Sequence, residues 1–345
     1  AHEVALADKI ADLTYSDGET TWKLFDGWKF GAQADAKVVP LTAPEKDASQ
    51  VTEDDFYDIF WELDRDSMQT YLDEHPQTLA NGWAGIDINE SGLTQSGTSI
   101  RTTMGEQVLA VNFREKVLLV RVAGEKYRGV LAVAKVPARL SVEMSEGLGS
   151  YGQTVGEIAE AHGGLLSMTC NGFLDPGGQG NGGELAGFAM SDGVPYGEHY
   201  PYTDDFPYAR FEILTDNTVC IRRSDEAVRA DCRDATEFNP ALIIDGEIIQ
   251  SNYWTSEAPR ACIGQSSRQE MLLLVIEGRM PESGILGTSV NECSAILARH
   301  GAVQAMNVDG GTSAIMWYDG QCVTRCCNLA LPSGRALPNA FVYHK

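Results

Sequence analysis

The sequence predicts an α+β fold: a mixed, largely antiparallel sheet with flanking helices and a mainly helical N-terminal extension. Apolar and β-branched runs separated by hairpin-length connections occur over 108–136 and again over 314–324, as antiparallel neighbours require. Strand–helix–strand units, which build parallel sheets, are fewer: one ends at 165–170 and the other at 304–308. We expect the sheet to carry functional side chains at its strand ends, on loops held by a rigid scaffold.

The N-terminal part has the apolar spacing of helices. Residues 2–14 and 52–63 repeat apolar side chains every three or four positions, and Pro76 ends a shorter helix. Of the chain's 49 acids and 26 bases, 20 and 6 lie in this part, and we assign them to solvated helix faces. We therefore expect residues 1–100 to form an acidic, mainly helical region and 101–345 to form the main domain.

The main domain alternates strands with two well-capped helices. Thr154 with Glu157, and Ser289 with Glu292, have the spacing of N-terminal capping boxes. The expected strands cover 108–113, 117–122, 128–136, 165–170, 242–244 and 271–276, and the expected helices 154–163 and 289–301.

Charge and hydropathy limit the kind of partner. A net charge of −23 argues against nucleic acid and anionic membranes as ligands. No apolar stretch is long enough to span a bilayer. The chain begins at Ala1, so we expect an upstream export or anchor segment and an extracellular or cell-surface location.

All eight cysteines lie between Cys170 and Cys327. Their number is even, no Cys-x-x-Cys occurs, and no histidine adjoins the group at 322–327, so zinc is disfavoured. We expect two to four disulfides formed in an oxidising compartment, with Cys170 outside them.

The stretch 307–320 holds the strongest chemical signal. An apolar run is followed by Asp309, Gly310 and Gly311, and then by the hydroxyl side chains of Thr312 and Ser313. Successive backbone N–H groups at such a corner can bind an anion, and a carboxylate there suits acid–base or nucleophilic work. A tight turn with an Asx-type hydrogen bond is the alternative.

Other expected strands end in similar corners: Asn171-Gly172, Asp245-Gly246 and Glu277-Gly278-Arg279. If these ends converge with Asp309, amide, carboxylate and guanidinium groups meet in one cleft. Arg260 and Arg335 are further cations for a bidentate contact with phosphate. No Gly-x-Ser-x-Gly, Walker or dinucleotide motif is present to indicate hydrolase, kinase or dehydrogenase chemistry. We expect no cofactor and assign no metal ligands.

Six segments, taken in order, resemble the phosphodiester glycosidase family over roughly residues 128–345. Bacterial members, often described as exopolysaccharide proteins, carry an N-terminal extension comparable to residues 1–127. The matching segments are Cys170-Asn171-Gly172-Phe173, Gly180-Asn181-Gly182-Gly183, Ala258 to Gly264, Glu277-Gly278-Arg279, Asn307 to Ser313 and Arg335 to Asn339.

The resemblance implies a hydrolase that cleaves the glycosidic bond of a sugar-1-phosphodiester, such as one carrying N-acetylglucosamine. It implies that 101–345 is the catalytic domain and that the partner is a sugar phosphodiester or phosphoglycan. It assigns catalysis to Asp309, Asn171 and Arg260. The substrate-binding residues that we expect beside them are Arg279, Gly310, Gly311, Thr312, Ser313, Asn307, Gly172 and Asn339.

Two other classes of function stay open at this point. The same corner could bind phosphoglycans without turning them over, as a cell-surface recognition module. A phosphodiesterase that breaks the P–O bond would use a similar anion clamp, usually with metal ions and clustered carboxylates and histidines.

Overall fold

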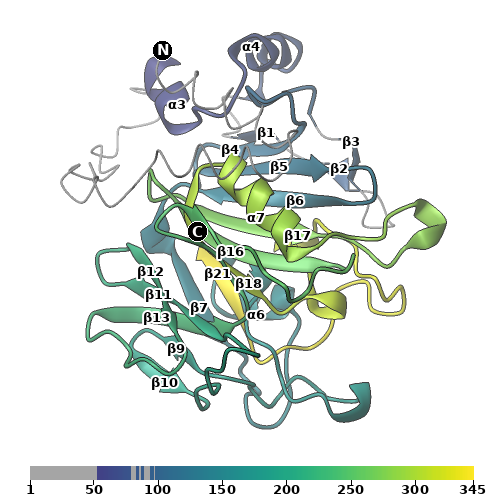
Figure 1. The fold of residues 1–345 in the computed structure, drawn as a ribbon. Coiled ribbons are helices and arrows are strands. Elements are labelled where there is room, and N and C mark those ends of the chain that lie inside the picture. Colours follow the sequence, from purple (N-terminus) through teal and green to yellow (C-terminus); the bar gives the residue numbers. More distant parts are fainter. Residues whose placement is uncertain (1–52, 79–82, 85–86, 89–93, 97) are drawn as a thin grey trace.

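The computed structural model describes residues 53–78, 83–84, 87–88, 94–96 and 98–345 (Figure 1). The helix expected over 2–14 lies outside the described residues. Helices α3 (Glu53–Ile59) and α4 (Arg65–Glu74) form within the region expected to be helical. None of the described helices is both long and apolar enough to cross a membrane.

Nine strands form the largest sheet, which runs across the upper half of the molecule (Figure 1). One block of neighbouring strands comes from residues 83–134 and the other from residues 241–308, and the two blocks meet where β6 pairs with β17. In spatial order the strands are β1 (Trp83–Ala84), β4 (Val108–Asn112), β5 (Val117–Ala123), β6 (Arg128–Ala134), β17 (Met271–Ile276), β16 (Arg260–Ser266), β18 (Ala302–Val308), β14 (Ala241–Ile244) and β15 (Glu247–Ile248).

Two five-stranded sheets lie beside it. The second sheet has the order β20 (Gln321–Cys322), β19 (Met316–Tyr318), β8 (Gly164–Thr169), β21 (Asn339–His344), β7 (Leu140–Met144). The third has the order β10 (Val194–Tyr196), β9 (Ala189–Ser191), β13 (Cys232–Phe238), β11 (Ala209–Leu214), β12 (Val219–Arg223). A further pair joins β2 (Asp87–Ile88) and β3 (Thr94–Ser96).

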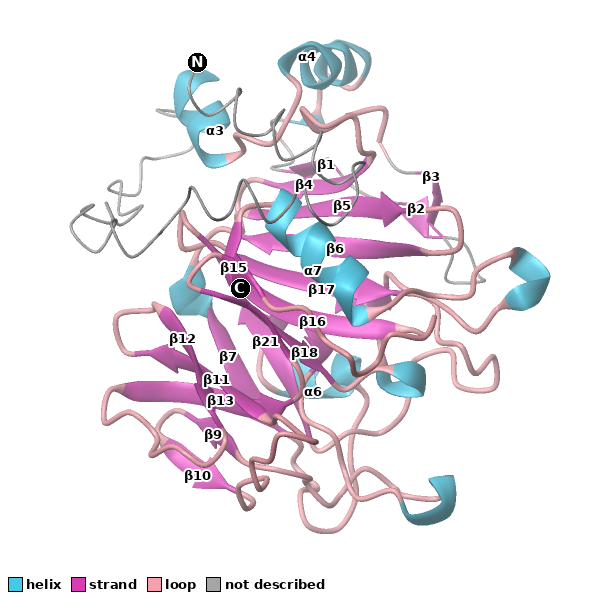
Figure 2. Cartoon of the chain, in the orientation of Figure 1, coloured by secondary structure: helices cyan, strands magenta, loops and turns pink. Residues whose placement is uncertain are grey.

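Every pairing between the described strands is antiparallel, so the expectation of a mixed sheet is wrong. The two strand–helix–strand units do form, but a strand from elsewhere in the chain separates their strands. β21 lies between β7 and β8, and β16 lies between β17 and β18. Each unit therefore contributes strands that run the same way without pairing. The fold is mostly sheet, with few helices (Figure 2).

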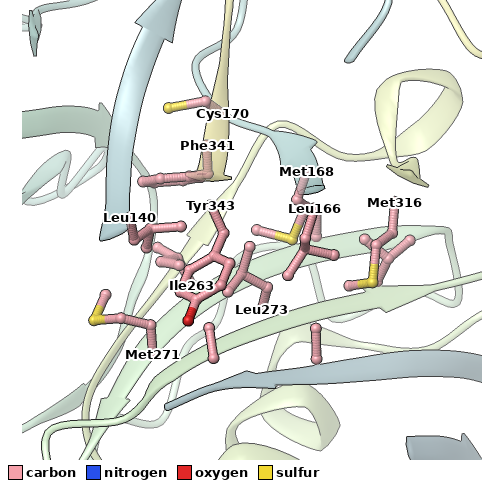
Figure 3. Packing of buried hydrophobic residues seen from close by; sticks show 14 of the residues in the cluster. Leu140, Leu166, Met168, Cys170, Ile263, Met271, Leu273, Met316, Phe341 and Tyr343 are labelled. Carbon is pink, nitrogen blue, oxygen red and sulfur yellow. The ribbon is translucent and has the colours of Figure 1, made fainter. Parts of the chain in front are cut away.

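The core has layers of sheet covered by helices. Between the first and second sheets, Ile263 and Leu273 pack against Leu166, Phe341 and other apolar side chains (Figure 3). Helix α7 (Val290–Arg299) covers the outer face of the nine-stranded sheet, together with residues of α3 and α4. Helix α6 (Val155–Ala161) covers the second sheet with Ile158 and Ala159. The described part of the N-terminal region thus shares a core with the large sheet.

All eight cysteines lie among the described residues and are free, so the expectation of two to four disulfides is not met. Cys170, Cys262 and Cys293 are fully buried and belong to the apolar clusters. A free cysteine packs as a small apolar side chain, which accounts for their places in the core.

Candidate active site

The candidate site lies where the chain passes from the first sheet to the second. After β18, residues 309–314 turn through the short 3₁₀ helix η6 (Gly311–Ser313) before β19. Gly311 has φ of 60°, a conformation that glycine adopts without strain. The Asp309 N–H donates to the Cys170 carbonyl at 3.2 Å, which joins the end of β18 to the end of β8.

Three of the four expected corners meet at this edge. In the strand register Arg260 faces Ile276, and Ala261 faces Val308, so the ends of β16, β17 and β18 lie together. The hydrogen bond to Cys170 adds the end of β8. The Asp245-Gly246 corner is at the opposite end of β18, because the Gly246 N–H donates to Val303 at 2.8 Å. Antiparallel pairing of β14 with β18 dictates this separation.

Asp309 has the electrostatics of an acid–base group. Burial raises the pKa of its carboxyl to about 6. Hydrogen bonds from the Ser313 side chain and the Gly310 N–H, together with the positive charge of Arg335, favour the carboxylate and limit that rise. A carboxyl with a pKa near the working pH can accept a proton and release it again.

The Gly310–Gly311 corner is not an open nest of N–H groups. The Gly311 N–H donates to the Pro259 carbonyl at 3.0 Å, and the Gly310 N–H serves the Asp309 carboxylate. The expectation that both amides bind an anion is therefore wrong for this conformation. The turn instead fixes the carboxylate by local hydrogen bonds.

Arg279 is the cation that faces this corner. Its guanidinium lies over Gly311, with Nη1 3.2 Å from the place that a β-carbon on that glycine would occupy. It also hydrogen-bonds the Cys327 thiol, whose Sγ is 3.6 Å from Thr312 Oγ1. The residue is exposed and forms no ion pair with a carboxylate among the described residues. Hydrogen bonds with Cys326 and Thr312, together with the charge of Arg279, lower the pKa of the Cys327 thiol to about 6.

Arg260 is buried and holds the backbone. Nε donates to the Thr288 carbonyl at 3.0 Å, and Nη2 donates to the carbonyls of Trp254 at 2.9 Å and Ser256 at 2.7 Å. Burial lowers its pKa, and the nearby charge of Arg279 lowers it further. These bonds make Arg260 a residue that positions the 254–256 segment, which sequence reasoning did not anticipate.

Three asparagines expected at the site are buried hydrogen-bonding centres. The Asn171 carbonyl oxygen accepts from Thr236 at 2.6 Å and from Asn339 at 3.0 Å, and its amide donates to Phe188 at 3.0 Å. Asn307 donates to the Asn239 carbonyl at 2.7 Å. Since Asn171 and Asn339 are fully buried and Asn307 nearly so, these side chains do not face a substrate in this structure. Their hydrogen bonds join strands, and their assignment to catalysis or binding stays a prediction.

Tyr200 is a candidate site residue that the sequence did not indicate. Its hydroxyl is 4.0 Å from the place that a β-carbon on Gly172 would occupy, so it lies beside the Asn171-Gly172 corner. Burial raises the Tyr200 pKa, and the nearby charge of Asp309 raises it further. The phenol therefore stays protonated and can donate a hydrogen bond beside the carboxylate.

Both the ring and the backbone of Tyr200 are held in place. The ring stacks on Tyr208, with centroids 4.0 Å apart and planes 14° from parallel. The backbone N–H of Tyr200 donates to the Glu237 carboxylate at 3.0 Å, and that buried carboxylate also pairs with Arg210 at 3.1 Å. The only signal in the sequence was a tyrosine-rich segment, 196–208, without a motif.

Arg335 completes the charged surroundings of Asp309. It binds Asp175 at 2.6 Å and the Gly180 carbonyl at 3.2 Å, with its guanidinium 4.5 Å from the Phe173 ring. Phe173 and Gly180 lie in two of the segments that carry the resemblance, and Asp175 lies between those segments. Within the described part of the chain, no three His, Cys, Asp or Glu side chains are placed to hold a metal ion together.

Among solved structures, the chain is similar to the catalytic domain of zebrafish N-acetylglucosamine-1-phosphodiester alpha-N-acetylglucosaminidase, auto-inhibited by its pro-peptide. The two share 16% identity and a TM-score of 0.54, over 66% of this chain and 82% of that one. Two further structures have TM-scores below 0.5. A hypothetical protein from Synechocystis has 0.47, at 13% identity over 70% of this chain and 65% of that one. A protein from Burkholderia pseudomallei described as exported has 0.48, at 15% identity over 64% and 74%.

No curated protein sequence matches the chain. The phosphodiester glycosidase family matches residues 166–344, which is more than half of the sequence and includes β8, β16 to β18 and the Asp309 corner. The chain belongs to the phosphodiester glycosidase family.

Proposed function

We propose that this protein hydrolyses the glycosidic bond of a sugar-1-phosphodiester, releasing the free sugar and a phosphomonoester. The observation that carries the proposal is the Asp309 carboxyl, whose pKa is raised to about 6 at the junction of two sheets. The exposed Arg279 guanidinium and the protonated Tyr200 hydroxyl lie in the same neighbourhood. Together they supply a proton acceptor, a cation and a hydrogen-bond donor.

The substrate's chemistry matches these three groups. A glycosyl phosphodiester carries one negative charge, which the Arg279 guanidinium can contact through two N–H groups. Its leaving group is a phosphate monoester, which departs more readily than an ordinary alcohol and needs less help from a general acid. What remains is to position water and to stabilise the oxocarbenium-like transition state.

In the step that we propose, water attacks the anomeric carbon while the bond from that carbon to the phosphate oxygen breaks. The phosphate monoester leaves with the bonding electron pair, and Asp309 takes the proton from the water. The Tyr200 hydroxyl donates to an oxygen of the sugar or of the phosphate. Direct attack by the Asp309 carboxylate, followed by hydrolysis of a glycosyl-enzyme, is the variant of this route.

N-acetylglucosamine is the sugar that we propose to be tested first. The zebrafish structure of the same fold carries that sugar in its name. At 16% identity this similarity concerns the fold, so the sugar remains part of the proposal.

The test is hydrolysis of a panel of glycosyl phosphodiesters in ¹⁸O-labelled water, with both products analysed by mass spectrometry. The proposal requires the label in the sugar, because the C–O bond breaks. Label in the phosphate would identify a phosphodiesterase that cleaves P–O. Saturable binding of the same compounds without turnover would identify a recognition module.

A further inference from the structure

Trp254 is held in an unusual conformation on the surface beside the site. Its φ is 52°, in the left-handed region that bulky side chains rarely adopt, and its side chain is 50% exposed. Such a conformation costs free energy and persists where the surroundings impose it, commonly at functional sites. An exposed tryptophan in this state calls for a functional explanation.

Three hydrogen bonds fix the position of this residue. The indole Nε1 donates to Asn239 Oδ1 at 2.8 Å. The Trp254 carbonyl accepts from Arg260 Nη2 at 2.9 Å and from the Val290 N–H at 3.2 Å. The indole is therefore rigid although it is half exposed, and little conformational entropy is left to lose when a ligand binds.

Tyr253 precedes Trp254 in the chain, and Phe206 lies across from Tyr253 in another loop. Phe206 is 57% exposed, and its ring lies 6.3 Å from that of Tyr253, with planes 29° apart. The Tyr253 hydroxyl donates to the Asp204 carbonyl at 3.2 Å, which ties the two loops together. We call Phe206, Tyr253 and Trp254 the aromatic patch.

Three connections join the aromatic patch to the candidate active site. Asn239, which holds the Trp254 indole, accepts at its carbonyl from Asn307, two residues before Asp309. Arg260, which holds the Trp254 carbonyl, begins the strand next to β18. Phe206 belongs to the same loop as Tyr200, whose pKa responds to Asp309.

We infer that the aromatic patch is a saccharide subsite, which binds neutral sugar rings of a glycan chain next to the phosphodiester under attack. This inference rests on the proposed function, and it makes the natural substrate a glycan chain rather than a small sugar phosphate. Rigid aromatic rings offer large apolar faces at low entropic cost, and the apolar faces of sugar rings fit them. The exposed acids Asp204 and Asp205 beside Phe206 repel a polyanion, so the occupant is neutral.

The test is calorimetric titration with three neutral hexasaccharides (chitohexaose, cellohexaose and maltohexaose) and with the matching monosaccharides. At least one hexasaccharide should bind the parent protein. Trp254→Ala and Phe206→Ala should each weaken that binding about tenfold, and Trp254→Phe should stay within about threefold of the parent. Val194→Ala removes an equally exposed apolar side chain, on edge strand β10, and should change nothing.

Phe206→Ala keeps the test decisive should Trp254→Ala fold poorly, since the Phe206 side chain is 57% exposed and has no hydrogen-bonding atom. The inference is overturned if no hexasaccharide binds at millimolar concentration, or if Phe206→Ala binds as the parent does. Self-association that disappears in Phe206→Ala, without any sugar binding, would overturn it in favour of a protein contact. Because binding is measured without turnover, hexasaccharide binding in a protein that hydrolyses no phosphodiester would refute the proposed reaction alone.

Discussion

The backbone N–H of Asp309 donates to the carbonyl of Cys170 at 3.2 Å, and so connects the ends of two strands that belong to different sheets. Strand β8 is buried along its whole length and β18 at all positions but Val303, so neither end can move without disturbing a packed core. Two rigid sheets thus hold the carboxylate in position. A catalytic group needs such support, because it must meet a substrate atom to within fractions of an ångström.

Asp309→Asn should lower turnover of a glycosyl phosphodiester about a hundred- to ten-thousandfold, because the amide keeps the size of the side chain but cannot accept the proton. Binding of an inert sugar-phosphate analogue should persist. Steady-state kinetics and calorimetry measure the two effects. Asp245→Asn is the matched control: it changes another Asp-Gly corner at the opposite end of β18 and should leave turnover unchanged. Near-parental turnover in Asp309→Asn would make Asp309 a turn residue.

The pH profile of kcat/KM should rise through about pH 6 and then level off. Burial raises the Asp309 pKa to about 6, and a general base works only after it has lost its proton. Activity should therefore fall about tenfold for each pH unit below that value. Tyr200 adds no fall on the alkaline side of neutrality, since its raised pKa keeps it protonated. A profile that is highest near pH 4 would instead make Asp309 a general acid.

Tyr200→Phe should lower kcat about a hundredfold while leaving the melting temperature unchanged. The substitution removes the hydroxyl near Asp309 but keeps the ring that stacks on Tyr208. Tyr208→Phe removes a hydroxyl from the other ring of the stack and serves as the control. Equal kinetics for the two variants would show that the Tyr200 hydroxyl touches no reacting group.

Arg279→Gln should raise KM for the charged substrate about tenfold with little change in stability, because the guanidinium is exposed and forms no ion pair with a carboxylate among the described residues. The loss should shrink at high salt, which screens exposed charges. Arg223→Gln changes an exposed arginine of the third sheet, paired with Asp225, and should not alter KM. An unchanged KM in Arg279→Gln would show that the substrate's phosphate binds at another residue.

Arg260→Lys should mainly reduce stability, by about 1–3 kcal/mol, because one ammonium group cannot replace the guanidinium bonds to three separate carbonyls. Urea unfolding followed by circular dichroism gives this number. The resemblance predicted a substrate contact at the same residue. A variant as stable as the parent but with weakened substrate binding would restore that assignment.

Local signals in the sequence predicted much of the fold. The capping box at Thr154 and Glu157 is present, and Ser289 accepts from the Glu292 N–H, so both helices of the main domain begin where expected. The Asp319-Gly320 turn joins β19 to β20 as the hairpin signal indicated. The third sheet was missed, because β11 and β13 carry Arg210, Glu212 and Glu237. These buried charges satisfy one another and hide the alternation that marks a strand.

The sequence by itself determined the family motifs, the strand-end position of Asp309 and the glycine turn that follows it. Only the tertiary structure decided which polar side chains face outward. Asn171 and Asn339 look like ligands in the sequence, but they bond each other across 168 positions of the chain and are buried. Tyr200 carries no motif, yet folding brings it to Asp309. The physical reason is that a polar side chain's role depends on its partners, and strand pairing between distant segments supplies those partners.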